Sequence, residues 1–219
     1  STIDSFIDDP ENKIRYKKCG KYIVTLLLFK DSKTNEARST FNPVYAKYRT
    51  NKALVLNIEH MTTGDKINEV CNSTYKYGML NYHVNEIVET SYNDNIDIVC
   101  AAGIHYYKTK EQAFCHGITV DMCRVLNLTC NLKRWQDDGS LISERNYISG
   151  KLNGICRYVD RHHKLRDESE YFNGKMHGVR KKWRDDGSLS SERNYVSGKL
   201  NGISRRFDMH NKIQNECTY

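Results

Sequence analysis

The chain has 219 residues, which allows one large domain or two small ones and excludes a large multidomain assembly. Its 15 Tyr, 6 Phe and 2 Trp make it too aromatic for a disordered protein, and its net charge is +7. No segment approaches the roughly 20 apolar residues of a membrane-spanning helix, and no signal peptide is evident. We therefore expect a cytoplasmic protein that is not secreted and has no transmembrane segment. Its eight cysteines lack paired spacing and are expected to be reduced thiols.

The first half of the chain predicts a mixture of strands and one short helix. Thr109 and Gln112 have the spacing of a capping box, so a helix should follow Thr109 and end near Gly117. Apolar runs and an alternating pattern predict buried or half-buried strands at residues 22–29, 53–58, 83–89 and 103–107.

The second half of the chain repeats every 24 residues. Residues 133–160 and 181–208 differ at only seven of 28 positions. The same step relates columns of Leu or Ile, Glu and bulky apolar residues, and these columns include Trp135 and Trp183. The aromatic column is Tyr147, Tyr171 and Tyr195. The turn columns are Gly150, Gly174 and Gly198, then Lys151, Lys175 and Lys199, then Gly154, Gly178 and Gly202.

Each repeat predicts a β-hairpin. The two glycines of each copy should bracket a short loop, because a tight turn or bulge needs positive φ. The sequence Asp-Asp-Gly-Ser at residues 137–140 and 185–188 should turn the chain into the next hairpin. We therefore predict a mainly β protein: a small α+β domain over residues 1–131, then an elongated antiparallel meander of about three and a half repeats over residues 132–219.

Most of the positive charge lies on the repeats. Residues 1–131 carry 16 Lys and Arg against 15 Asp and Glu, whereas residues 132–219 carry 18 against 12. A sheet of repeats would align these cations as a basic stripe flanked by aromatic rings. The candidate binding surface is Trp135, Tyr147, Tyr171, Arg180, Lys181, Lys182, Trp183, Arg184, Tyr195, Arg205 and Arg206. The alternative is a solvated sheet whose charges only maintain solubility.

A second charged pattern has a structural interpretation. Glu144, Glu168, Glu192 and Glu216 share the 24-residue period with Arg157, Lys181 and Arg205. Equivalent residues of successive hairpins lie two strands apart, about 9–10 Å, which is too far to share one metal ion. We therefore expect cross-strand ion pairs here.

The chain lacks the patterns of common enzymes. Phosphate-binding loops, dinucleotide fingerprints and nucleophile elbows are missing from the sequence. The group His105, Cys115, His116, Cys123 and Cys130 has metal-ligating residue types, but its spacing is not that of a zinc site. We therefore predict no catalytic residue, no metal and no cofactor. An enzyme in the first half remains the third hypothesis, with His105, Cys115 and His116 as the residues to test.

The repeats resemble the MORN repeat in its variant form. The matching marks are Asp-Gly-x-Leu, then Glu, then Tyr-x-x-Gly-Lys-x-x-Gly, as in residues 147–154. This resemblance covers about residues 133–216. It implies a single-layer β-solenoid used for contacts with proteins, and in some members for proposed contacts with membrane lipids. No catalytic residue comes with the family.

The first half, over roughly residues 15–116, resembles an uncharacterised domain that accompanies pentapeptide or MORN-type repeats in giant-virus and some bacterial proteins. The matching stretches are residues 47–59 and 103–113. The many Asn, Lys, Ile and Tyr residues agree with an AT-rich genome and so favour a viral source, with the virion or host cytoplasm as the location.

The expected function is that of a non-enzymatic scaffold that presents its basic β-repeat surface to a protein partner. The alternative is peripheral binding to anionic membrane lipids through the same face. We expect no nucleic-acid partner, because the net charge of +6 on the repeats is modest for that role. Self-association through the last strand of the repeats is a further form of the protein-partner hypothesis.

Overall fold

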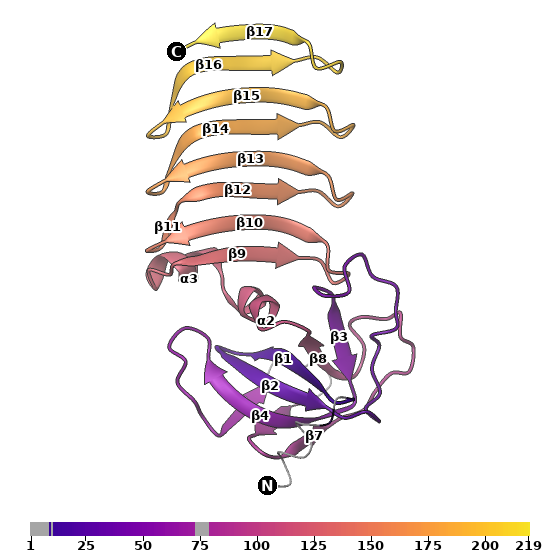
Figure 1. Cartoon of the computed structure of the whole chain (residues 1–219). Coiled ribbons are helices and arrows are strands. Elements are labelled where there is room, and N and C mark those ends of the chain that lie inside the picture. Colours follow the sequence, from indigo (N-terminus) through magenta and orange to yellow (C-terminus); the bar gives the residue numbers. More distant parts are fainter. Residues whose placement is uncertain (1–8, 10, 73–78) are drawn as a thin grey trace. The chain divides into compact units, whose positions relative to one another are not determined.

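The computed structural model describes residues 9, 11–72 and 79–219 (Figure 1). Contacts divide the chain into two compact units, both built mainly from antiparallel strands. The first unit comprises the residues up to Gly117 together with Gln136–Ser140, and the second comprises Ile118–Trp135 with Leu141–Tyr219. The contacts therefore divide the chain earlier than the boundary near residue 132 that the sequence predicts. No helix of the described residues is long and apolar enough to cross a membrane.

The first unit contains a six-stranded sheet, a two-stranded sheet and one described helix. The order in the larger sheet is β3-β8-β1-β2-β4-β7, and β5 pairs with β6. The elements are β1 (Lys13–Cys19), β2 (Tyr22–Leu28), β3 (Lys47–Thr50), β4 (Lys52–His60), β5 (Glu69–Asn72), β6 (Leu80–His83), β7 (Ile87–Glu89), β8 (Ile104–Tyr107) and α2 (Lys110–Gly117).

The core of the first unit forms around β2 and β4, the two strands with the longest apolar runs. Val24, Leu26, Val55 and Ile58 are fully buried and belong to one apolar cluster. The strands predicted at residues 22–29, 53–58 and 103–107 are therefore confirmed within one or two residues of their ends.

The predicted single strand at residues 83–89 is wrong. The chain turns between β6 and β7, and Asn85 adopts a φ of +69°. Asparagine tolerates this left-handed conformation better than most residues, so the turn interrupts an otherwise alternating sequence.

The predicted helix is confirmed as α2. The backbone N–H of Gln112 donates to Oγ1 of Thr109 at 3.2 Å, as an N-cap requires. The reciprocal half of the capping box is wrong, because the Gln112 side chain donates to the carbonyl of Tyr45 instead.

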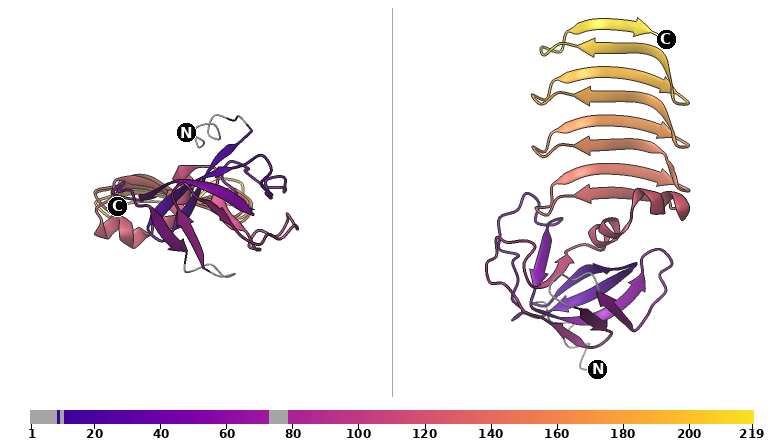
Figure 2. Two further views of the ribbon diagram at one scale, coloured as in Figure 1. Left: turned by 90° about the horizontal axis from the view of Figure 1, so that it is seen from below. Right: turned by 180° about the vertical axis from the view of Figure 1, so that it is seen from behind.

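The second unit is a nine-stranded antiparallel sheet preceded by the short helix α3 (Val120–Val125), which the sequence analysis did not predict. Its strands are β9 (Cys130–Trp135), β10 (Leu141–Ile148), β11 (Lys151–Leu152), β12 (Gly154–Val159), β13 (Leu165–Phe172), β14 (Lys175–Trp183), β15 (Leu189–Val196), β16 (Lys199–Phe207) and β17 (Ile213–Thr218). Strand β9 pairs with one edge of β10, β11 and β12 pair with the other edge, and β12 to β17 then follow in chain order, as Figure 1 and the right-hand view of Figure 2 show.

The hairpin turns differ from the prediction in one respect. The two residues that turn the chain are Ser149-Gly150 and its copies, and both residues of each pair have positive φ. The second glycine of each repeat lies inside the next strand and not at the other side of the loop. There Gly154 pairs with Tyr171, and Gly178 with Tyr195. Gly154, Gly178 and Gly202 have φ values of +87°, +100° and +80°, so the predicted need for positive φ is confirmed at the second glycine as well.

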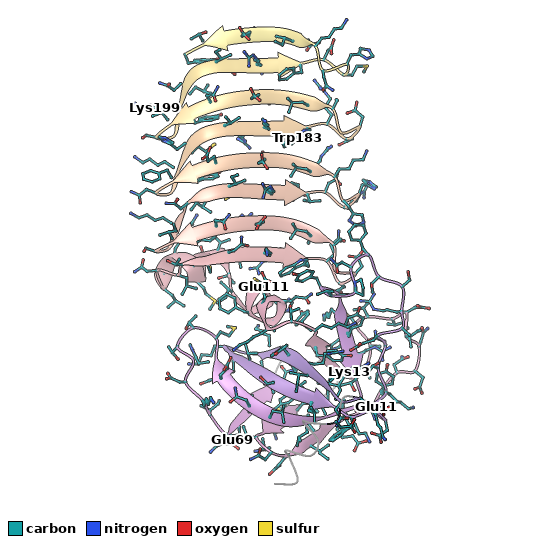
Figure 3. The ribbon with its side chains drawn as sticks, viewed as in Figure 1. Glu11, Lys13, Glu69, Glu111, Trp183 and Lys199 are labelled. Carbon is teal, nitrogen blue, oxygen red and sulfur yellow. The ribbon has the colours of Figure 1, made fainter. Side chains whose placement is uncertain are left out.

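The bulky column lies at the other end of the hairpins. Trp135 pairs with Leu141, and Trp183 pairs with Leu189. In Figure 3, Trp183 lies at the last residue of β14, and Lys199 lies at the opposite side of the sheet, beside a hairpin turn. These cross-strand apolar pairs support a packing role for the two tryptophans.

Candidate binding surface

The pairing of the nine-stranded sheet sorts its charged residues onto two faces. Eight of its nine strands, all except the short β11, each contribute three consecutive residues to a regular band in which residues of neighbouring strands pair. Because successive residues of a strand point to opposite faces, the middle residues share one face and the outer residues share the other. The middle residues are Lys133, Glu144, Arg157, Glu168, Lys181, Glu192, Arg205 and Glu216.

The middle row, which we call the ion-pair ladder, alternates cation and carboxylate on every neighbouring strand. Arg157 lies 3.4 Å from Glu144 and 2.8 Å from Glu168. Further along, Arg205 lies 3.6 Å from Glu192 and 2.6 Å from Glu216. Four cations and four carboxylates make this row neutral. The predicted cross-strand ion pairs are therefore confirmed.

The outer rows form what we call the cationic face. It is defined by six cations and one carboxylate, so it carries nearly all the excess charge of the repeats. These residues are Arg134, Arg145, Asp167, Arg180, Lys182, Arg193 and Arg206.

Most cations of this face have no polar partner. Arg180 forms an ion pair with Asp167 at 2.6 Å, which raises the pKa of the arginine. The side chains of Arg145, Lys182, Arg193 and Arg206 make no hydrogen bond or ion pair with any residue that the structure describes. An anionic ligand would therefore not need to displace an existing partner from these four side chains.

A hollow of about 250 Å³ opens between β10 and β14. Cys156 and Ser169 pair across β12 and β13 at this point, and their small side chains leave the space unfilled. Arg145 and Arg180 stand at opposite ends of the hollow, with Tyr171 also in its lining. Asp167 also lines the hollow and holds Arg180, so the Arg145 guanidinium and the Tyr171 hydroxyl are the groups left to receive a negatively charged side chain.

The structure brings together only part of the predicted surface. Arg180, Lys182 and Arg206 lie on the cationic face, whereas Lys181 and Arg205 belong to the ion-pair ladder. Their separation follows from strand alternation, which sends adjacent residues to opposite faces.

Two further predicted residues are held by structural contacts. Arg184 donates to the carbonyls of Leu189 and Asp208 at 2.9 and 3.1 Å. Tyr147 is 3% exposed and belongs to the interior of the second unit. Neither side chain is free to act as a surface anchor.

Arg145 and Arg193 were missed by the sequence analysis. They occupy one column of the 24-residue period, but Ser169 stands between them and hides the pattern. The sequence signal that could have found them is strand alternation: the residues directly before and after each residue of the ion-pair ladder point to the opposite face of the sheet.

The predicted cysteine and histidine group divides between the two units. His105 contacts the carbonyl of Val99 at 3.0 Å, and burial together with the charge of Lys47 lowers the pKa of His105 to about 4. The His116 ring packs on Tyr107. Among the described residues, no three His, Cys, Asp or Glu side chains are grouped so as to hold a metal ion.

A small hollow of about 260 Å³ lies on the β5–β6 hairpin and contains a thiol and an imidazole. Glu69 lies 3.3 Å from Nδ1 of His83, but the described side chains show no hydrogen bond between His83 and the exposed Cys71. A thiol nucleophile needs such a base, so this hollow lacks the arrangement of a Cys-His catalytic pair.

Comparison with known proteins places the first half of the chain in a family. Curated proteins contain no match to this chain. The Family of unknown function (DUF5758) matches residues 4–113, which is half of the chain. The chain therefore belongs to this family of unknown function.

Proposed function

We propose that the protein is a non-enzymatic interaction protein. In this proposal the second unit is a MORN-type solenoid that presents the cationic face to a protein partner, and the first unit is a small α+β domain joined to it. Support comes from the 24-residue hairpins, their unbroken order in the sheet and the resemblance of their turns to variant MORN repeats.

One observation carries the proposal: charge is segregated between the two faces of the sheet. The ion-pair ladder neutralises itself, while the opposite face keeps four cations without a partner among the described side chains. A sheet that used charge only for solubility would not need this segregation, because exposed charges of either sign serve that purpose. An acidic protein surface is the complementary partner.

The test compares two variants of equal charge. The first removes Lys182, Arg193 and Arg206 from the cationic face by substitution to Gln. The control removes Lys151, Lys175 and Lys199, the exposed lysines of the hairpin turns, in the same way. Affinity capture with mass spectrometry is then run on both variants and on the unchanged chain. We expect the unchanged chain and the control variant to retain specific proteins that have an acidic binding surface. The variant of the cationic face should lose them.

Two results would count against the proposal. Equal retention by both variants would show that the cationic face is not the binding surface. Equal loss of the captured proteins by both variants would show that they bind through the net charge of the chain and not through the cationic face. Light scattering of the three proteins verifies that a change of oligomeric state does not cause the difference.

Peripheral binding to anionic lipid is the second candidate function. The observation that favours it is Tyr158, which is 50% exposed and shares the outer rows with Arg134 and Lys182. Tyrosine prefers the membrane–water interface, and nearby cations attract acidic headgroups. Vesicles with and without phosphatidylserine test this function. Binding must require the acidic lipid and fall steeply with salt, since exposed charges are screened within about 10 Å at 0.1 M.

A further inference from the structure

Helix α3 and the loop after it cover the beginning of the repeat sheet. We call residues 120–129 the cap segment. The backbone N–H of Gly150 donates to the carbonyl of Leu128 at 2.9 Å, and that of Ser149 donates to Oγ1 of Thr129 at 3.0 Å. A side chain at position 150 would approach the carbonyl oxygen of Cys123 to 2.9 Å, so the first hairpin turn packs directly on the cap segment.

Two thiols lie at the junction of this cap segment and the sheet. Cys123 is on α3 and fully buried, and Cys130 begins β9 and is half-buried. Their Sγ atoms are 3.9 Å apart. A disulfide has an S–S distance of about 2.05 Å, so the two sulfur atoms, already in van der Waals contact, must move about 2 Å closer to be joined.

We propose that Cys123 and Cys130 are an oxidisable thiol pair, a modification site that reacts with a hydroperoxide and forms a disulfide between α3 and β9. The half-buried Cys130 reacts first. Its thiolate attacks the outer peroxide oxygen and becomes a sulfenic acid, while the peroxide O–O bond breaks and its other half leaves as an alcohol or water. The sulfur of Cys123 then attacks the sulfenic sulfur and expels hydroxide, which takes the Cys123 proton and leaves as water.

The roles of the two thiols follow from their surroundings. Burial raises the pKa of Cys123, so this thiol is a poor first nucleophile for an oxidant in solution. It is well placed as the second thiol, because it needs only to reach a sulfur that already lies beside it. The hydroperoxide is the two-electron oxidant, and the two thiol sulfurs are the groups oxidised.

The crosslink would close a loop of eight residues that contains the rest of α3 and the segment leading into β9. It would tie α3 to the first residue of β9 and oppose opening of the cap segment. The hydrogen bonds from Ser149 and Gly150 to the cap segment would then be retained more of the time. This site is independent of the cationic face and of the function proposed for it.

The experiment treats the full chain with dilute hydrogen peroxide and maps the products by mass spectrometry after the free thiols are alkylated. A triple variant, Cys71→Ser, Cys100→Ser and Cys217→Ser, removes the three exposed thiols and suppresses crosslinks between chains. We expect a 123–130 crosslink with the loss of two hydrogens in both the unchanged and the triple-variant protein. Cys130→Ser in the triple-variant background should abolish the crosslink and leave Cys123 largely reduced.

Hydrogen exchange gives the second measurement. Oxidation should slow exchange of the Ser149 and Gly150 amides and leave exchange at the distant β15–β16 turn unchanged. The proposal is overturned if both thiols are alkylated after peroxide has oxidised the exposed cysteines. Pairing of either thiol with a different cysteine would also overturn it. A crosslink that leaves the exchange of these two amides unchanged would refute the predicted effect on the cap segment.

Discussion

Arg180 on β14 and Arg193 on β15 lie directly opposite each other in the register of the repeat sheet. Like charges in this position destabilise a sheet. Asp167 neutralises Arg180 from the other side, but Arg193 has no ion-pair partner within the described part of the chain. Sheet stability therefore does not explain Arg193, whereas the acidic partner proposed for the cationic face would explain it.

Replacing Arg193 by Ser should leave the chain as stable as before or slightly more stable. The substitution installs the residue that the preceding repeat has at Ser169 and removes the like-charge pair, which gives a change of up to about 0.5 kcal/mol in favour of folding. Urea denaturation measures it. Arg205→Ser is the control, because it breaks ion pairs with Glu192 and Glu216 and should lower the free energy of unfolding. A larger loss from Arg193→Ser than from the control would contradict the functional interpretation of Arg193.

The stability of the first unit should depend on pH through Glu36. Burial opposes ionisation of this carboxyl group, but hydrogen bonds from Arg15 and Tyr106 outweigh burial and, with Lys108 nearby, hold the pKa of Glu36 at about 2. The folded pKa is lower than the ordinary value of 4.5, so the stabilisation is fully present above pH 4.5 and is lost as the pH falls toward 2. It amounts to about 3 kcal/mol.

Glu36→Gln isolates this contribution from those of other carboxylates. The unfolding free energy of the unchanged protein should exceed that of the variant at pH 6, and the difference should shrink steadily as the pH approaches 2.5. A difference that does not vary over this range would show that Glu36 is not an ionised partner of Arg15.

Two glycines in equivalent turns should respond differently to alanine. Gly139 and Gly187 have φ values of +86° and +88°. A Cβ at Gly139 would overlap the carbonyl of Asn42 and lie 2.7 Å from the backbone nitrogen of Ala46, whereas one at Gly187 meets nothing within 4 Å. Gly187→Ala should therefore cost only the about 1–2 kcal/mol of a left-handed conformation. Gly139→Ala should cost clearly more, because backbone atoms cannot easily move aside.

Urea denaturation of the two full-length variants measures the difference. It tests whether the Gln136–Ser140 turn packs in the first unit, where Asn42 donates to Asp138 and Lys47 donates to Asp137, each at 3.0 Å. Equal costs at the two glycines would rule out this packing.

Arg49 should not be replaceable by lysine. Its side chain is fully buried, and its guanidinium donates to the carbonyls of Ile98 and Ala102 at 3.0 and 3.2 Å while packing on the Tyr92 ring. A lysine ammonium cannot reach several carbonyls in one plane, so Arg49→Lys should lower the free energy of unfolding by about 3 kcal/mol or more. Arg124→Lys, at an exposed position, is the control and should change stability by less than about 0.5 kcal/mol. Similar effects at both positions would show that the guanidinium does not organise the 92–102 loop.

The hairpins and the ion-pair ladder could be predicted because they follow from a fixed period. Glu144 and Arg157 recur together, and their neighbours in space are the adjacent strands of the same repeat. The separation of Lys181 from Lys182 could also have been predicted, since alternation in a strand requires it. The prediction of a single basic stripe leaves this alternation out, and the strand register separates the basic residues onto two faces.

Other features had weak signals or none. Helix α3 spans only Val120–Val125, which is too short for a helical period. Its N-cap is Thr119, whose Oγ1 accepts from the backbone N–H of Met122, and a threonine in this role is a recognisable sequence signal. The burial of Arg49 and of Glu36 depends on contacts between segments far apart in the sequence, and no local pattern distinguishes a buried charge from an exposed one.

The ion-pair ladder has a consequence for how such a sheet can lengthen. Two hairpins, from β12 to β15, add Arg157, Glu168, Lys181 and Glu192 to the ladder, which leaves its net charge unchanged. The same two hairpins add three cations and one carboxylate to the other face. Gene duplication in steps of 48 residues would therefore extend the sheet without electrostatic penalty on one side and raise its valency for a polyanionic ligand on the other.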